Sequence, residues 1–291
     1  MEFRELQNFL AVAQEGTISG AAQALHVPQP SLSRQMRELE EQLGKTLFIR
    51  GNRRITLTEE GLILQRRAKE IIHLMQKTEH EIVNTSKEMT GDIYIGAAET
   101  KAVHYLTQAA VALRKSHPNI HFHISSGDTN DSMYQLEQGL IDFALLFYPP
   151  DIEKYNHIQL PVSDNMVALM RKEHPLSRKE SVSFLHDLVT EPLIISRLAR
   201  DTAVHGIETS SLNVVGTYNL AYNASIMVED GLGIALCFDS IVNINSRSDL
   251  CVVPITDLDT VIHPVIIWKK YQAMTHAAKA YIEKLQQIEQ V

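Results

Sequence analysis

The chain has 291 residues, 44% of them hydrophobic, and a net charge of −8, so it is too long for one small domain and suits two or three. It has no run of about 18 apolar residues, and its first five residues lack the apolar segment of a signal peptide. We therefore expect a soluble, cytoplasmic protein with no membrane partner. Its two cysteines, Cys237 and Cys251, match neither a zinc site nor a disulfide framework, which favours reduced core thiols over a redox pair.

The charge is unevenly distributed along the chain. Residues 1–90 contain twelve basic and twelve acidic residues, so the whole acidic excess lies after residue 90. Residues 29–69 contain nine basic residues against five acidic ones. A local excess of this kind is what a surface facing DNA phosphates needs. The acidic total therefore does not exclude DNA binding.

Three short helices are predicted at the N-terminus. Apolar residues at helical spacing from Phe3 to Ala13 predict the first, which Gly16 stops. The second follows Ser19 as its N-cap. The third starts at Gln29-Pro30-Ser31, because proline in the first turn loses no hydrogen bond, and it ends at Gly44. This order is typical of a helix-turn-helix.

The third helix has one apolar face and one polar face. Its apolar stripe, which we expect to face the core, is Leu32, Met36, Leu39 and Leu43. In a helix-turn-helix the N-terminal end of this recognition helix enters the major groove of DNA. The DNA contacts predicted from the helices are Ser19, Gln29, Pro30, Ser31, Ser33, Arg34 and Arg37.

A β-hairpin wing follows the recognition helix. Strands are predicted at residues 47–49 and 55–57, with a basic tip between them that includes Arg50, Arg53 and Arg54. We expect these arginines to contact phosphates or the minor groove, which positions a protein more than it specifies sequence. Residues 1–58 are thus predicted to be an all-α winged helix-turn-helix domain.

A long linker helix is predicted next, over residues 59–90. Thr58 is its N-cap, and no breaker other than Gly61 interrupts it from Glu59 to about Glu88. Its apolar seam is Leu64, Ala68, Ile71, Met75 and Ile82. A lone helix cannot bury such a seam but a second copy can, so we expect a homodimer or homotetramer. The alternative is a helix that lies on its own domain.

These residues resemble the LysR-type transcriptional regulators. The resemblance rests on Ala21-Ala22-Gln23-Ala24-Leu25, Gln29-Pro30-Ser31-Leu32-Ser33-Arg34-Gln35-Met36, Leu39-Glu40-Glu41-Gln42-Leu43-Gly44, Leu47-Phe48-Ile49-Arg50 and Leu57-Thr58-Glu59-Glu60-Gly61. It continues more weakly through Gly91-Asp92-Ile93-Tyr94-Ile95-Gly96, Gly139-Leu140-Ile141-Asp142, His174-Pro175-Leu176 and Gly231-Leu232-Gly233-Ile234-Ala235. The resemblance implies a transcription regulator that binds operator DNA and RNA polymerase.

Residues 91–291 alternate strand and helix patterns, which predicts an α/β domain. The predicted strands are 93–96, 121–125, 143–147, 166–170, 193–196, 214–217, 234–237 and 264–268, with a final helix over 275–288. The resemblance implies an effector-binding domain with two lobes like a periplasmic binding protein. It places lobe I at 91–161 and 265–291 and lobe II at 162–264, with crossings near Leu160-Pro161 and His263-Pro264 and a cleft between the lobes.

The effector site is predicted at the carboxyl ends of the strands, where open α/β sheets bind ligands. This rule selects Thr100, Lys101, Gly127, Asp128, Ser196 and Arg197. The family resemblance also places effector contacts at Thr100 and Asp128. Lys101 and Arg197 suit an anion, whereas Glu99 and Asp128 suit an amine or a mixed-charge ligand. The identity of the effector stays open, because Glu99-Thr100-Lys101 and Phe238 depart from the common family pattern.

No enzyme site is evident. His121 and His123 share a strand face but lack a third ligand, so we expect no metal and no cofactor. Three hypotheses remain. The first is a DNA-binding transcription regulator modulated by a small molecule between two lobes. The alternative is a small-molecule binding protein whose N-terminal helices serve dimerisation only. The third, which the residues support least, is an enzyme with a DNA-binding appendage.

Overall fold

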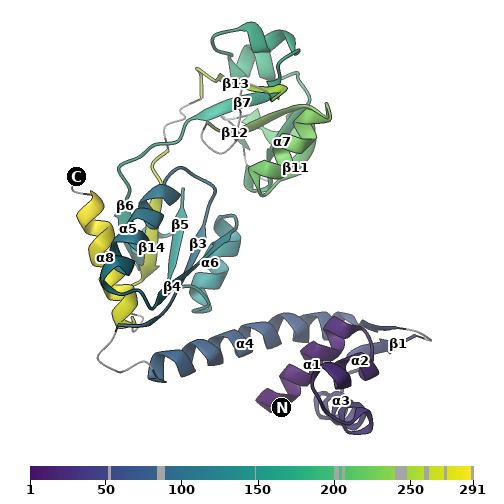
Figure 1. Cartoon of the computed structure of the whole chain (residues 1–291). Helices are drawn as coiled ribbons and strands as arrows, with labels where there is room; N and C mark the ends of the chain where they lie inside the picture. The colour runs from purple at the N-terminus through teal and green to yellow at the C-terminus, as the bar shows by residue number, and fades with distance from the viewer. Residues whose placement is uncertain are drawn as a thin grey trace. The chain divides into compact units, whose positions relative to one another are not determined.

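The computed structural model describes residues 1–51, 54–83, 89–147, 149–199, 203–204, 207–239, 248–258, 262–271 and 274–289. It divides into two compact units, Met1–Thr85 and Ser86–Val291. Figure 1 shows helices and a two-stranded ribbon in the first unit and two sheets with flanking helices in the second. No described helix combines the length and the apolarity needed to cross a membrane.

The first unit begins with three helices around one core. They are α1 (Phe3–Glu15), α2 (Ile18–Ala24) and α3 (Gln29–Leu43). Both predicted glycine stops are confirmed, because Gly16 and Gly44 follow α1 and α3 with φ values of 65° and 61°. The left-handed region is accessible to glycine without steric cost. The core residues shared by these helices include Phe9, Val12, Ala21, Ala22, Leu32, Met36 and Leu39.

Two predicted details of these helices are wrong. Ser19 is not the N-cap of α2, because that helix begins at Ile18. The N-cap is Thr17, two residues before Ser19, and its Oγ1 accepts the Gly20 N–H at 3.1 Å. Ser19 lies exposed in the first turn. Leu43 is 41% exposed rather than part of the core, since the buried stripe ends one turn earlier at Leu39.

The wing is an antiparallel hairpin of β1 (Phe48–Arg50) and β2 (Ile55–Leu57). In the predicted tip, Arg53 lies outside the described residues, and only the backbone of Arg50 is described. α4 (Glu59–Val83) follows, and the Thr58 Oγ1 caps it by accepting the Gly61 N–H at 3.0 Å. The predicted extension of this helix to residue 88 lies outside the described residues.

Lobe I, the name we use for the first sheet of the second unit with its helices, has the strand order β4-β3-β5-β14-β6. The strands are β3 (Gly91–Ala97), β4 (Ile120–Ser126), β5 (Phe143–Leu146), β6 (Tyr155–Gln159) and β14 (Val265–Lys269). Helices α5 (Val103–Ser116) and α8 (His276–Glu289) pack side by side on one face, and α6 (Thr129–Glu137) packs on the other (Figure 1).

Lobe II, the second sheet with its helices, has the order β11-β8-β12-β7-β13. The strands are β7 (Met166–Arg171), β8 (Leu193–Ser196), β11 (Val214–Tyr218), β12 (Ile234–Phe238) and β13 (Leu250–Pro254). Helix α7 (Ala221–Glu229) covers one face, and a π-helical turn (Phe184–Leu188) packs on the other. Short pieces complete the unit: β9 (Ala203–Val204), β10 (Ile207–Glu208) and 3₁₀ turns at Ile152–Lys154, Pro175–Arg178, Arg197–Ala199 and Thr209–Ser211.

The predicted α/β class with two lobes is confirmed, and strands occur at all eight predicted places. Two five-residue strands were missed. β6 contains too few apolar residues to stand out, and β13 ends in Pro254, which marks an edge strand because proline has no N–H to donate. The two segments that join the lobes run side by side, since Asp164 and Ile262 exchange backbone hydrogen bonds at 3.0 and 3.1 Å.

Candidate functional sites

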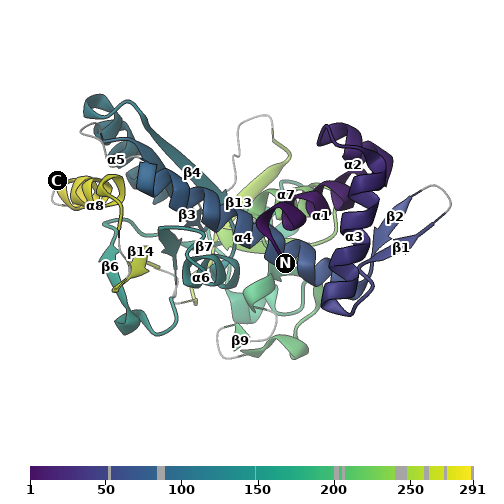
Figure 2. The ribbon, with the colours of Figure 1, turned by 90° about the horizontal axis from the view of Figure 1, so that it is seen from below.

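The exposed end of α3 carries the residues predicted to read DNA. Gln29, Pro30, Arg34 and Arg37 are exposed. Ser31 and Ser33 are half-buried. The opposite face of α3 is fixed in the core, because Leu32, Met36 and Leu39 have no exposed surface. The helix can therefore present its polar edge to a partner without unfolding. Figure 2 views the same helices and the β1–β2 hairpin from below.

The basic side chains on this surface are held loosely. Arg34 Nε lies 3.4 Å from Glu38 Oε1, and the Arg37 Nε donates to the Ser33 carbonyl at 3.4 Å. The side chains of Arg34 and Glu38 are 73% and 50% exposed. An exposed ion pair of this kind contributes on the order of 0–1 kcal/mol. Arg34 can therefore exchange Glu38 for a phosphate or a base edge at small cost.

Two polar residues that hold α3 were not singled out from the sequence. Asn8 on α1 is 5% exposed, and its Nδ2 donates to Gln35 Oε1 on α3 at 2.8 Å. Glu40 Oε1 accepts the backbone N–H groups of Leu47 and Phe48 at 2.7 and 3.2 Å, which ties α3 to the wing. A buried asparagine on an otherwise apolar helix face is the one sequence signal that could have marked Asn8.

The apolar seam of α4 divides into two parts. Leu64 packs against the helix-turn-helix core and Ala68 is fully buried. Farther along α4, the seam is open in the single chain: Ile71 is 43% exposed, Met75 40% and Ile82 66%. Leu74, which the sequence analysis did not include, is 44% exposed beside them. The first part of the seam is thus filled by the chain itself, whereas the side chains of the second part are exposed to solvent.

In the second unit, Thr100 and Lys101 join lobe I to acidic residues farther along the chain. The Thr100 Oγ1 donates to Asp164 Oδ2 at 2.5 Å, and both residues are buried. Lys101 Nζ lies 3.6 Å from Asp239 Oδ1 at the end of β12. Neither aspartate could be assigned as a partner from the sequence, because each is more than sixty residues away from the residue that it contacts.

Asp128 and Arg197 form a direct bridge between the lobes. Asp128 is the N-cap of α6, and its Oδ2 accepts from the Arg197 Nε at 3.0 Å and from Nη2. Arg197 also reaches Asp131 Oδ2 at 3.0 Å. Burial raises the pKa of Asp128, but the Asp131 amide and the Arg197 guanidinium lower it by more, so the net pKa is below the ordinary value. Asp128 therefore stays ionised at neutral pH.

The remaining predicted positions lie close to this bridge. Gly127 donates its N–H to the Ala97 carbonyl at 3.2 Å, and Ser196 ends β8 one residue before Arg197. The lobes also touch where the Glu99 Oε2 accepts the Ala221 N–H at the start of α7. Phe147, which follows β5 of lobe I, also meets Phe238, the last residue of β12 in lobe II, with ring centroids 4.4 Å apart. Thr100, Lys101, Asp128 and Arg197 thus all contribute to contacts that join the lobes.

Other candidate sites carry no comparable chemistry. Burial raises the pKa of the Cys237 thiol to about 12, and burial also raises the pKa of Cys251. Both thiols are free and protonated at neutral pH, which disfavours oxidation. His123 Nε2 lies 2.9 Å from Asp92 Oδ1 and its ring stacks on Tyr94. Within the described residues, no three metal-binding side chains converge.

Comparison with known proteins covers both units. The description "LysR substrate binding domain" matches residues 86–289, and "Bacterial regulatory helix-turn-helix protein, lysR family" matches residues 3–62. The HTH-type transcriptional regulator BsdA of Bacillus subtilis (strain 168) is 25% identical over 294 residues, 97% of this chain and 99% of its own. A hydrogen peroxide-inducible genes activator of Pectobacterium carotovorum subsp. carotovorum is 29% identical over 196 residues, which span 67% of this chain and 64% of that relative.

Solved structures show the same architecture. CbnR, a LysR family transcriptional regulator, matches with a TM-score of 0.75 at 20% identity over 99% of both chains. Full-length CbnR in complex with its target DNA matches with a TM-score of 0.74 at 19% identity, again over 99% of both chains. These likenesses establish the fold of the whole chain.

Proposed function

This chain belongs to the LysR family of bacterial transcription regulators, because the family models for the helix-turn-helix and the substrate-binding domain together match nearly all of its residues, and we propose how the protein reads DNA and is regulated. It is a DNA-binding regulator with an effector-binding domain. Its relatives regulate transcription, and we assign it no catalytic role. In our proposal α3 and the wing hold an operator, and a small molecule bound between lobes I and II changes how RNA polymerase is engaged.

One observation supports DNA reading above all. The polar, basic edge of α3 is exposed while the rest of the helix is anchored in the core, and Arg54 of the wing is also exposed. Side chains that contact base edges or phosphates must be accessible in the unbound protein, and the helix that carries them must keep its position when DNA binds. We propose Gln29, Ser31, Ser33, Arg34 and Arg37, with the wing arginines, as these contacts, and Ser19 and Pro30 as their neighbours.

A gel shift with DNA from upstream of the chain's own gene tests this assignment. We expect Arg34→Ala to weaken binding by about 10-fold or more, since one bidentate base contact contributes roughly 1–3 kcal/mol. Arg178→Ala is the matched control, because it removes the same charge from an exposed position in lobe II. Equal binding by the folded Arg34→Ala variant and the wild type would favour the alternative, a small-molecule binding protein without operator reading.

We propose that the open part of the α4 seam pairs with a second copy of the chain. Ile71, Leu74, Met75 and Ile82 are exposed apolar residues at spacings of three, one and seven along one helix, which places them on one face. Two chains joined in this way could present two recognition helices to half-sites about one turn of DNA apart, or a multiple of one turn. A homodimer is the smallest assembly that fits, and a homotetramer can be built from two of them.

We propose that the effector binds where Thr100, Lys101, Gly127, Asp128, Ser196 and Arg197 lie, at the strand ends of both lobes. Several of these side chains now bond to each other or to Asp164 and Asp239 across the lobes. A ligand that takes over these bonds would change the relative stability of two lobe arrangements, which is how an effector shifts a conformational equilibrium.

A thermal-shift screen of metabolites on the full chain tests the effector site. A ligand that binds only the folded state raises the melting temperature. We expect a hit whose shift is lost in Arg197→Ala and kept in Arg178→Ala. A hit whose shift is the same in both variants would place the effector elsewhere.

A further inference from the structure

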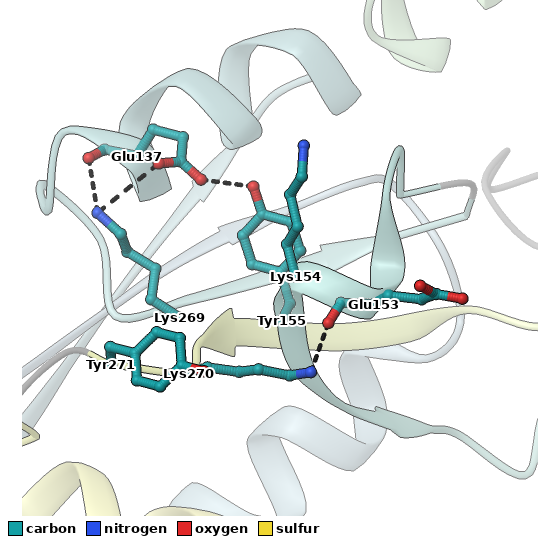
Figure 3. Close-up of a pocket in the computed structure, with 7 residues that line it drawn as sticks. All are labelled: Glu137, Glu153, Lys154, Tyr155, Lys269, Lys270 and Tyr271. Atoms are coloured by element: carbon teal, nitrogen blue, oxygen red, sulfur yellow. Dashed lines mark hydrogen bonds and ion pairs between the residues drawn. The ribbon is translucent and has the colours of Figure 1, made fainter.

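Lobe I contains a cavity of about 640 Å³ that shares no residue with the contacts between the lobes. It lies between the end of α6, the 3₁₀ turn Ile152–Lys154, the start of β6 and the end of β14 (Figure 3). β6 and β14 are adjacent antiparallel strands, and Tyr155 pairs with Lys269 in their register. Segments separated by more than a hundred residues therefore build one concave surface.

At the floor of the cavity, Tyr155 and Lys269 both bond to Glu137. The ring of Tyr155 is 7% exposed, and its hydroxyl donates to Glu137 Oε1 at 2.5 Å. Burial and Glu137 raise the pKa of Tyr155 to about 12, so this hydroxyl stays a donor at neutral pH. Lys269 Nζ donates to the Glu137 carbonyl at 2.8 Å and lies 3.8 Å from its carboxylate. Glu137 is thus occupied by groups of the chain itself.

Two further lysines line the cavity, and of these Lys270 forms no ion pair with a described residue. The lining contains three lysines and two glutamates. Lys154 Nζ pairs with Oδ2 of the exposed Asp151 at 2.6 Å. The Lys270 ammonium donates to the Glu153 backbone carbonyl, its one hydrogen bond to a described residue, while the Glu153 carboxylate points away from Tyr155 (Figure 3). An ammonium has three N–H donors, so Lys270 can bind an anion.

Aromatic rings lie beside these charges. Tyr155 is buried, whereas Tyr271, two residues after the end of β14, is 97% exposed. An exposed aromatic ring beside an ammonium without an ion pair can stack on a flat ligand while the ammonium, here that of Lys270, binds the charged group. We propose that this cavity is a second ligand site, for a small anion with a flat apolar body, a carboxylate or phosphate ester. The site goes beyond the regulator function and the interlobe effector proposed above.

Titration of the full chain with phenyl phosphate and with phenylacetate tests the site, with calorimetry as the readout. Trp268, the only tryptophan of the chain, precedes Lys269 in β14 and gives a second, optical readout. We expect saturable binding of at least one probe. Lys270→Gln and Tyr271→Ala should each weaken it about tenfold or more. Lys172→Gln should not, although Lys172 also donates to a backbone carbonyl, that of Ser248 in lobe II.

The two probes distinguish a phosphate ester from a carboxylate as the ligand of this cavity. Binding of phenyl phosphate alone assigns a phosphate ester, and binding of phenylacetate alone assigns a carboxylate. The proposal is overturned if neither probe saturates below 10 mM, on the order of the weakest useful affinity for so small a ligand. Equal affinity of wild type and Tyr271→Ala would also overturn it, as would inorganic phosphate or phenol binding as tightly as the ester. Because Tyr271 is fully exposed, its variant tests the site even if Lys270→Gln does not fold.

Discussion

Replacing Gly61 by alanine should destabilise the DNA-binding unit, although alanine is the better helix former. Gly61 lies in the first turn of α4, against Leu47, the residue before β1, and Leu57, the last residue of β2. A Cβ at this position would lie 2.3 Å from the Leu47 backbone oxygen and 3.1 Å from Leu57 Cδ2, whereas real Cβ atoms essentially never come within 3.0 Å. Because the nearest atom is a backbone atom, either α4 or the chain at Leu47 must move.

The size of the effect follows from what that movement breaks. The Leu47 carbonyl also accepts the Thr58 N–H at 3.0 Å, and the Thr58 hydroxyl donates to the Thr46 carbonyl at 2.8 Å. Overpacking costs roughly 1–3 kcal/mol, and a lost hydrogen bond costs about 1 kcal/mol more. Alanine returns about 1 kcal/mol of helix propensity. We expect a net loss of about 2 kcal/mol in the free energy of unfolding, with weaker operator binding.

Urea unfolding of the full chain measures this loss with an internal control. Far-ultraviolet circular dichroism reports on both units, whereas the fluorescence of the single tryptophan, Trp268, reports on Ser86–Val291 alone. We expect only the dichroism to shift. In Gly44→Ala, where no atom lies within 4 Å of the new Cβ, the loss should be about 1 kcal/mol from the left-handed φ. A Gly61→Ala variant as stable as the wild type would refute the steric argument.

Three further outcomes are expected. Burial raises the pKa of Asp257, but hydrogen bonds from Ser183 and from two backbone N–H groups lower it by more, to about 2. The ionised carboxylate therefore stabilises the fold fully above about pH 4, and this stabilisation is lost as the pH falls through about 2. Asp257→Asn should flatten the acid-unfolding profile in this range, and an unchanged profile would contradict the assignment. Cys237 should react with a thiol reagent at pH 8 only after denaturation; fast reaction of the folded chain would contradict its burial. Ile71→Asp should shift sedimentation toward the monomer, while Gln76→Ala should not; unchanged mass for both would exclude the α4 seam as the interface.

Much of the DNA-binding unit could be predicted because its signals are local. The stops at Gly16 and Gly44 each depend on a few neighbouring residues, as does the Thr58 cap. Periodicity placed Leu32, Met36 and Leu39 in the core before any contact was known. The cap of α2 was assigned two residues too late because threonine and serine are both good caps, and only the contact with Gly20 distinguishes them.

The partners of charged and polar side chains could not be predicted in the same way. The sequence marked Thr100, Lys101, Asp128 and Arg197 by their place at strand ends, but not that Asp164 binds Thr100 or that Asp128 binds Arg197. Such pairs are separated by more than sixty residues, and periodicity contains no information about which loops meet.

The α4 seam and the lobe I cavity also combine features that local sequence predicts with features that depend on tertiary contacts. Sequence spacing was enough to predict that one face of α4 is apolar, because the positions of side chains on a helix follow from its geometry. That Ala68 is fully buried while Ile82 is 66% exposed follows only from the packing of the folded chain. Likewise, Tyr155 and Lys269 become neighbours only through the register of β6 and β14. Local structure depends on nearby residues, whereas a binding surface depends on which distant segments the sheets bring together.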